Sequence, residues 1–249
     1  MPVHVEAAVA SRRDRIRAAT SQEIIATARR LLISQGSEAI SLRAIAREMG
    51  MTAPALYRYF DSHESLIQHV VADIFTELSD YVDAAIGAAD PGADGTARPT
   101  AVKLVTACQA FRGWAVGHPA EFAMIFGSPL PGVDLYRDDP LADCGLRFGT
   151  IFLRLMTELW QAQPFEVPAA DQIRPSLRPQ LESYRDQLRS DLPLGVLQTF
   201  LRCWVQLYGT VSLEVFGHLR FALEDSSGLF ELMLTDLAAM IGLTYPLPG

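Results

Sequence analysis

Apolar residues recur along most of this chain at intervals of three and four positions, which is the spacing of one face of an α-helix. No segment of useful length alternates apolar and polar residues as a strand would, and there is no internal repeat. The pattern therefore predicts an all-α protein. Its helices are expected to fall into a small N-terminal head of three helices and a larger helical body.

Capping residues mark the helices of the head. Thr20, with Glu23 three residues later, has the spacing of a capping box, so we expect the first helix to start there. Gly36 is expected to close it, because glycine commonly ends helices. Ser41 is the N-cap candidate of a second helix, and Gly50 makes the turn that follows. Asp61 and Ser62 then cap a long helix with a buried stripe formed by Leu66, Ile67, Val70, Ile74 and Leu78.

The third helix differs from its neighbours because its outer face carries small and aromatic residues and one arginine. Leu56 and Phe60 anchor it to the core, and Pro54 fits its first turn, where a missing amide costs nothing. The residues that point outward are Ala53, Ala55, Tyr57, Arg58 and Tyr59. A helix held by its neighbours and presenting such a face is shaped to enter a DNA groove.

Beyond a Gly-, Ala- and Pro-rich link at residues 87–99, every predicted element is helical, with a proline-rich loop at residues 128–140. The expected helices of the body are 100–118, 119–127, 141–163, 175–190, 193–219 and 227–242. The last two are apolar nearly all round, so they must be buried on both faces. In a chain of this size we expect the core on one side and a second subunit on the other, which predicts a homodimer.

The net charge of −8 hides an asymmetry between the two parts. Residues 1–60 contain nine arginines and five acidic residues, a charge of +4, whereas residues 61–249 carry 12 basic and 24 acidic residues, a charge of −12. A basic head on an acidic body fits one end that faces DNA. Residues 1–19 form a basic arm with Arg12, Arg13, Arg15 and Arg17; it is either a solvated tail or a contact to phosphate or the minor groove.

Composition predicts a cytoplasmic location. No uncharged apolar run approaches the ~18–20 residues that span a bilayer, and no signal peptide is expected at the N-terminus. The three cysteines, Cys108, Cys144 and Cys203, lie far apart within apolar patterns and are interpreted as buried free thiols in a reducing compartment.

Three segments of the head, SLRAIAREMGM, PALYRYF and DSHESLI, resemble the DNA-binding head of the TetR family of bacterial transcriptional regulators. The resemblance implies an all-helical homodimer with an N-terminal helix-turn-helix at residues 20–66 and a ligand-binding and dimerisation domain at residues 67–249, preceded by the arm at 1–19. The stretch WAVGHPAEFAMIFGSP is similar to a His-Pro element found in one subgroup of these regulators.

The same resemblance implies which residues bind DNA. They are Ser41, Arg43, Thr52, Ala53, Ala55, Tyr57, Arg58, Tyr59 and His63. Ser41, Tyr57 and Tyr59 match phosphate contacts, and Arg43 and Arg58 are the expected readers of base edges, with guanine as the expected base. Two alternatives stay open: Arg58 contacts phosphate instead, and the tyrosines only pack. His63 replaces the usual lysine, so this phosphate contact brings no full charge at neutral pH.

Large aromatic residues of the body either fill its core or wall a ligand cavity. The expected pocket residues are Phe111, Trp114, His118, Phe122, Phe126, Phe152, Met156, Trp204 and Tyr208. Trp114, His118 and Tyr208, together with Arg112, are the candidate polar groups of such a pocket.

No catalytic, cofactor or metal site is predicted. His118 has no nucleophile or carboxylate at a motif spacing, so it is interpreted as a helix breaker that caps a helix end or lines a cavity. His69 and Asp73, at i, i+4, are interpreted as a helix-surface pair rather than metal ligands.

The sequence thus predicts a ligand-responsive DNA-binding regulator, a repressor that leaves its operator when a small apolar or amphipathic molecule binds. Two other classes of protein remain open. One is a helical small-molecule-binding protein or enzyme with a vestigial DNA-binding head. The other is a helical interaction module that does not bind DNA at all.

Overall fold

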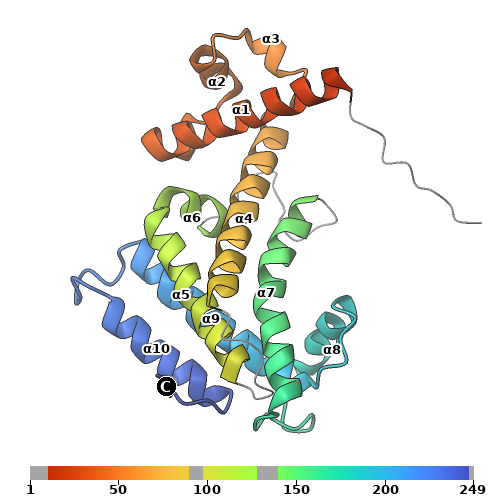
Figure 1. Cartoon of the computed structure of the whole chain (residues 1–249), viewed down its shortest axis with the longest axis vertical. Coiled ribbons are helices and arrows are strands. Elements are labelled where there is room, and N and C mark those ends of the chain that lie inside the picture. Colours follow the sequence, from red (N-terminus) through yellow and green to blue (C-terminus); the bar gives the residue numbers. More distant parts are fainter. Residues whose placement is uncertain (1–10, 90–97, 128–139, 247–249) are drawn as a thin grey trace, which may run out of the picture.

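A computed structural model describes residues 11–89, 98–127 and 140–246, and all regular structure within these ranges is helical (Figure 1). The prediction of an all-α fold is therefore confirmed. The helices are α1 (Arg12–Gln35), the 3₁₀ turn η1 (Ser37–Ala39), α2 (Leu42–Glu48), α3 (Ala53–Leu56), α4 (His63–Ala88), α5 (Arg98–Gly117), α6 (Pro119–Phe126), α7 (Pro140–Ala162), α8 (Arg178–Gln187), α9 (Leu194–Val215) and α10 (Ser227–Met240).

The head consists of α1, α2, α3 and the start of α4, and the predicted caps hold it in place. Ser41 accepts a hydrogen bond from the Ala44 amide (3.1 Å), and Ser62 accepts one from the Ser65 amide (3.0 Å). Gly36 and Gly50 have φ angles of 86° and 63°, a conformation in which glycine is favoured. Its fully buried core includes Ile24, Ala28, Ile45, Leu56 and Leu66.

The prediction that α1 starts at Thr20 is wrong. The helix begins at Arg12, because Ser11 and Asp14 form a complete capping box: Ser11 Oγ accepts the Asp14 amide, and the Asp14 carboxylate accepts the Ser11 amide. Thr20 lies inside the helix, where its hydroxyl donates to the Ile16 carbonyl (3.0 Å). The part of the basic arm from Arg12 onward is therefore regular helix, while residues 1–10 lie outside the described ranges.

Helix α4 joins the head to the body. Its 26 residues span roughly 39 Å at 1.5 Å per residue, and Figure 1 shows it running from beneath α1 down between α5 and α7. The predicted buried stripe on this helix is confirmed from Leu66 to Leu78. The predicted break at His118 is confirmed too, since α5 ends at Gly117 and α6 starts at Pro119. Most of the predicted link and loop (residues 90–97 and 128–139) lies outside the described ranges.

Helices α9 and α10 pack against each other and against α5, with Val196, Leu197, Val211, Phe230 and Leu234 among their buried residues. Several apolar side chains stay open on their other faces: Val205 is 66% exposed and Leu232 is 64% exposed, and Leu213, Phe216 and Leu229 are also exposed. Within the described ranges, no helix combines the length and apolarity that crossing a membrane requires.

Candidate nucleic-acid interface and apolar cavity

Only a short part of the predicted recognition helix is regular α-helix. Helix α3 makes one α-turn, and the backbone then continues as a tighter turn in which the Arg58 and Tyr59 amides donate to carbonyls three residues back (3.3 and 2.9 Å). Leu56 is fully buried and Phe60 is 2% exposed, so both ends of this segment are anchored in the head. The anchoring holds Tyr57, Arg58 and Tyr59 in one defined arrangement despite the short helix.

Two arginines of the predicted interface are exposed and free to bind an external anion. Arg43 lies on the outer side of α2, and Arg58 lies two residues beyond the end of α3. Neither forms an ion pair with a carboxylate in the parts of the chain that the structure describes. Tyr57, which lies between them in sequence, is 54% exposed. Thr52 is exposed too, and although it is the N-cap residue of α3, its side chain makes no capping hydrogen bond. Arg43, Thr52, Tyr57 and Arg58 therefore offer polar groups to solvent.

The small and aromatic residues of the interface are less open than predicted. Ala53, Ala55 and Tyr59 are partly buried, and both Ala53 and Tyr59 pack against the core of the head. For Tyr59 this placement agrees with the packing alternative, although the residue is only partly buried. The side chains of Ala53 and Ala55 are short and lie close to the head. Another molecule can therefore approach the backbone of α3 at these two positions.

Ser41 and His63 differ in what they still offer to a phosphate. The Ser41 oxygen accepts the Ala44 amide, which leaves its own O–H free to donate outward. The Nε2 of His63 lies 2.8 Å from the Ile40 carbonyl, and because a carbonyl can only accept, the ring donates its Nε2–H there. In the neutral ring the other nitrogen is an acceptor. The single N–H of a neutral His63 ring is therefore used inside the head, and the phosphate contact at this position stays a prediction.

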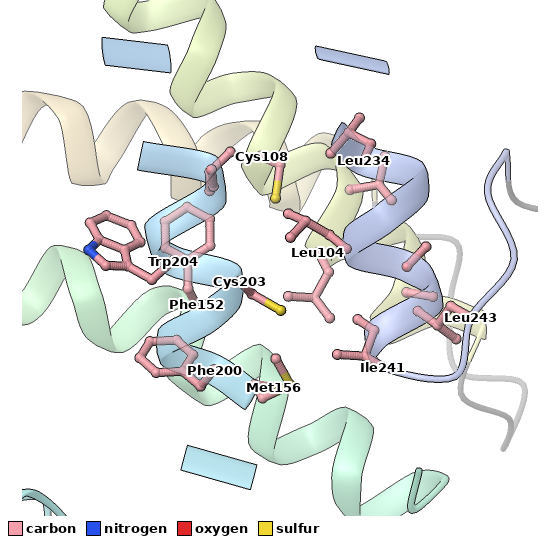
Figure 2. Close-up of a pocket in the computed structure, with 15 residues that line it drawn as sticks. Leu104, Cys108, Phe152, Met156, Phe200, Cys203, Trp204, Leu234, Ile241 and Leu243 are labelled. Carbon is pink, nitrogen blue, oxygen red and sulfur yellow. The ribbon is translucent and has the colours of Figure 1, made fainter. Parts of the chain in front are cut away.

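A cavity of about 60 Å³ lies in the body between α5, α7, α9 and α10 (Figure 2). Its lining is Ala101, Leu104, Val105, Cys108, Phe152, Met156, Phe200, Cys203, Trp204, Leu207, Leu234, Leu237, Ala238, Ile241 and Leu243. Burial raises the pKa of the Cys108 thiol to about 12, with Cys203 adding to the effect, and burial raises the pKa of Cys203 to about 11. Both thiols are therefore neutral at physiological pH, and the cavity wall carries no charge.

Three of the nine predicted pocket residues, Phe152, Met156 and Trp204, line this cavity. The others do not. Phe111 and Phe122 are fully buried, and their rings pack against each other and against Phe126 as part of the solid core. The cavity borders this aromatic cluster through Phe152 and Trp204, and leucines of α10 form part of its wall in place of the expected aromatic residues.

The predicted polar groups of the pocket all bind elsewhere in the protein. Tyr208 donates its hydroxyl to the Phe126 carbonyl (2.7 Å), and His118 donates Nδ1–H to the Trp114 carbonyl (2.9 Å). The His118 bond lies at the end of α5, which confirms its interpretation as a helix-end cap. Arg112 forms two 2.7 Å hydrogen bonds with Glu214 and lies over the Phe230 ring. None of these groups is available to orient a ligand in the cavity.

Comparison with known proteins decides the family. Residues 24–70 match the family model described as "Bacterial regulatory proteins, tetR family", and residues 104–237, more than half of the chain, match "Tetracyclin repressor-like, C-terminal domain". The HTH-type transcriptional regulators Rv1816 of Mycobacterium tuberculosis and Mb1846 of Mycobacterium bovis are each 31% identical over 215 residues, which cover 84% of this chain and 86% of the relative. The chain belongs to the TetR family.

Solved structures agree with this assignment. The crystal structure of a proposed regulatory protein, SCO4313, is similar with a TM-score of 0.69 and 29% identity, covering 92% of this chain and all of that one. A proposed TetR-family regulator from Shewanella sp. PV-4 shares the fold with a TM-score of 0.53 and 19% identity, over 87% of this chain and 96% of its own. The TetR-family assignment makes this chain a transcriptional regulator with a helix-turn-helix head, and not an enzyme.

In this TetR-family regulator an ion cluster joins the head to the body. Arg29 of α1 donates to Asp73 (2.9 Å) and Glu77 (2.7 Å) of α4, and its other terminal nitrogen lies 3.5 Å from Glu121 of α6, a residue that is 3% exposed. The Trp114 indole donates to Glu77 as well (3.3 Å). Residue spacing could have suggested only that Asp73 and Glu77 share one face of α4. Arg29 and Glu121 are 92 positions apart, beyond the reach of such a pattern.

The charge state of this cluster should depend on pH in the acid range. Burial alone raises the pKa of Glu77, but the hydrogen bonds and charge of Arg29 outweigh it, so the pKa lies below the ordinary value of 4.5. Because the folded pKa is depressed, the charge of Glu77 stabilises the fold above the unfolded pKa, and this stabilisation is lost as the pH falls through the folded value.

We therefore expect Glu77→Gln to be less stable than the wild type at neutral pH by about 1 kcal/mol or less, since the side chain is 43% exposed. The difference should close as the pH falls from neutral to below about 4.5 and Glu77 becomes protonated in the folded state. Urea unfolding of both proteins across this range measures it, with Glu182→Gln on exposed α8 as the control. A difference that persists once Glu77 is protonated in the folded and unfolded states would show that the charge of Glu77 is not its cause.

Proposed function

We propose that this protein is a sequence-specific repressor that binds a near-palindromic operator as a homodimer and leaves it when a small apolar molecule binds the body. The observation that carries the proposal is the exposed surface of α2 and α3, where Arg43 and Arg58 have no carboxylate partner within the described parts of the chain. Unpaired guanidinium groups on a basic head can form bidentate hydrogen bonds with guanine or with phosphate.

Entry of the α3 segment into a DNA groove would give the residues of this surface different roles. The short helix and its small residues Ala53 and Ala55 allow the backbone to come close to the groove floor. Arg58 then reaches base edges from the end of α3, and Arg43 reaches them from α2. The Ser41 hydroxyl and Tyr57 lie at the margin, where they can donate to phosphates and fix the register.

Dimerisation is supported by the open apolar faces of α9 and α10. On α9, Val205, Gly209, Leu213 and Phe216 follow one another at i, i+4, i+8 and i+11, so they form one stripe. A Cβ atom added to Gly209 would meet nothing within 4 Å, which means that a second helix can approach the backbone closely there. A twofold dimer would present two recognition segments to half-sites about one helical turn apart.

The cavity supports an effector that is uncharged and apolar rather than amphipathic. Its wall consists of apolar side chains and two neutral thiols, and a charged group would be buried there without a partner. Leu234 of α10 and Ile241 directly after this helix lie on one side, and Cys203 and Trp204 of α9 lie on another (Figure 2). A ligand larger than the 60 Å³ space must displace the side chains that these helices contribute, and a still larger one must move the helices themselves. It can release the operator only if it binds the displaced arrangement more tightly.

Selection of bound duplexes from random DNA tests this function. We expect enrichment of a sequence with dyad symmetry whose half-sites are about 10 base pairs apart, and affinity that falls steeply as salt rises. Adding uncharged apolar molecules of increasing size should then raise the thermal stability of the protein and release that operator. Enrichment of no symmetric sequence would contradict the DNA-binding function, whereas release by charged molecules alone would contradict the assignment of the cavity.

A further inference from the structure

The first two turns of α1, residues 12–19, form a helical extension that has no packing role within the described chain. Every residue from Arg12 to Ala19 is exposed, and even its one large apolar side chain, Ile16, is 56% exposed. Yet the start of this extension is fixed by the capping box of Ser11 and Asp14. A helix end that is well capped but buries no side chain contributes little to the stability of the fold. We therefore look for its role in a contact with another molecule.

The extension lies beside the segment that α3 presents to DNA. Arg17 Nη2 donates a hydrogen bond to the Arg58 carbonyl (3.0 Å), which ties the two segments together across 41 positions of sequence. Figure 1 shows this end of α1 passing α3 and continuing beyond it. At 1.5 Å per residue, Arg13 lies about 6 Å further along the axis of α1 than Arg17. The extension thus continues outward from the recognition segment.

Charge and helical position show which side of the extension can meet an anion. Residues 11–19 carry four arginines and one aspartate, and that aspartate is held in the capping box. Successive residues of an α-helix are rotated by about 100°, so Arg13 lies about 40° from Arg17 and on the side that faces Arg58. Arg15 lies about 200° from Arg17, on the opposite side. Arg13 and Arg15 therefore carry the same charge on the same two turns but point away from each other.

We propose that this extension is a second DNA-binding element, in which Arg13 binds the phosphates that flank the half-site read by α3. Arg17 is a positioning residue that holds the backbone of Arg58 against α1. The inference rests on the proposed function, since it requires an operator. It adds that the operator extends beyond the bases that α2 and α3 reach, and that this outer part is bound by charge and not by sequence.

The test compares Arg13→Ala with Arg15→Ala in the full chain on two duplexes. One duplex ends at the last base pair of the selected dyad, and the other continues by about ten base pairs, or one helical turn, on each side. The wild type should bind the longer duplex more tightly. Arg13→Ala should lose most of that gain, about threefold to tenfold in affinity, and the slope of log K against log salt should become shallower by about 0.9 for each phosphate that is no longer neutralised. Arg15→Ala should keep both the gain and the slope.

The matched pair separates a specific phosphate contact from the general effect of charge. Equal losses in the two variants on the longer duplex, or equal binding of both duplexes by the wild type, would overturn the proposed contact while leaving the regulator function intact. If the wild type selects no duplex at all, the proposed function fails, and the inference fails with it. Both arginines are exposed, so circular dichroism should show unchanged helix content in either variant.

Discussion

Replacing Arg43 and Arg58 together with alanine is expected to abolish specific operator binding while the protein stays folded. A good bidentate contact to a base contributes about 1–3 kcal/mol, and the dimer loses four of them, so binding should weaken by at least about 10³-fold. Both side chains are exposed and make no ion pair in the described parts of the chain, so thermal stability should change little. Fluorescence anisotropy with the selected operator and with a scrambled duplex measures the loss.

The control removes the same charge from the body, with Arg174→Ala and Arg185→Ala. Arg174 is exposed, and Arg185 forms only a long surface ion pair of 3.8 Å with Asp186, so neither substitution should disturb the fold. This variant should bind the operator as the wild type does. If Arg43→Ala with Arg58→Ala also binds the operator normally, these two arginines do not read its bases. If neither the variant nor the wild type binds any duplex specifically, the head is vestigial and a small-molecule-binding role for the body becomes the better explanation.

The single variant Arg58→Ala distinguishes the two roles left open for this residue. If Arg58 reads a base, the variant should relax specificity at one position of each half-site. If Arg58 binds phosphate instead, affinity should fall by a similar factor on every duplex, and the salt dependence should become less steep. A repeat of the duplex selection with this variant separates the two outcomes.

Local signals predicted the head well, because the groups that end its helices lie within three or four residues of each other. Ser41, Ser62, Gly36 and Gly50 all act as predicted, each through its own backbone or the amide three positions on. The start of α1 was mispredicted for a related reason. The sequence contains two capping patterns nine residues apart, at Ser11 and at Thr20. Spacing alone does not show which of them starts the helix and which lies inside it.

The cavity was harder to predict, because its position depends on how four helices pack and not on any one of them. The sequence left open whether Phe111 and Trp114 fill the core or wall a cavity, and both are buried away from the cavity, because a periodic pattern cannot tell a filled core from a cavity wall. The hydrogen-bond partners of the predicted polar groups could not be found from the sequence either. Tyr208 bonds to a carbonyl 82 positions away, and Arg112 bonds to a carboxylate 102 positions away. Once such bonds form, the predicted polar groups no longer face a ligand.

Charges placed on the open faces of α9 and α10 should convert the proposed dimer to a monomer and thereby remove tight operator binding. Val205→Glu with Leu232→Glu puts four carboxylates into a twofold interface, where each would be buried without a partner. Because these side chains are 66% and 64% exposed in the single chain, the monomer itself should remain folded. Sedimentation velocity at micromolar concentration measures the change of mass directly.

Loss of the dimer should reduce affinity for the full palindrome by about 10²- to 10⁴-fold, because the second half-site is no longer bound as part of the same molecule. Binding to a single half-site should be unchanged, since α2 and α3 are untouched, and this distinguishes a monomer from a misfolded head. Leu146→Glu on α7 is the matched control, because this residue is also 57% exposed and apolar but lies outside α9 and α10. If the double variant remains a dimer with full affinity, the subunits must associate through another surface.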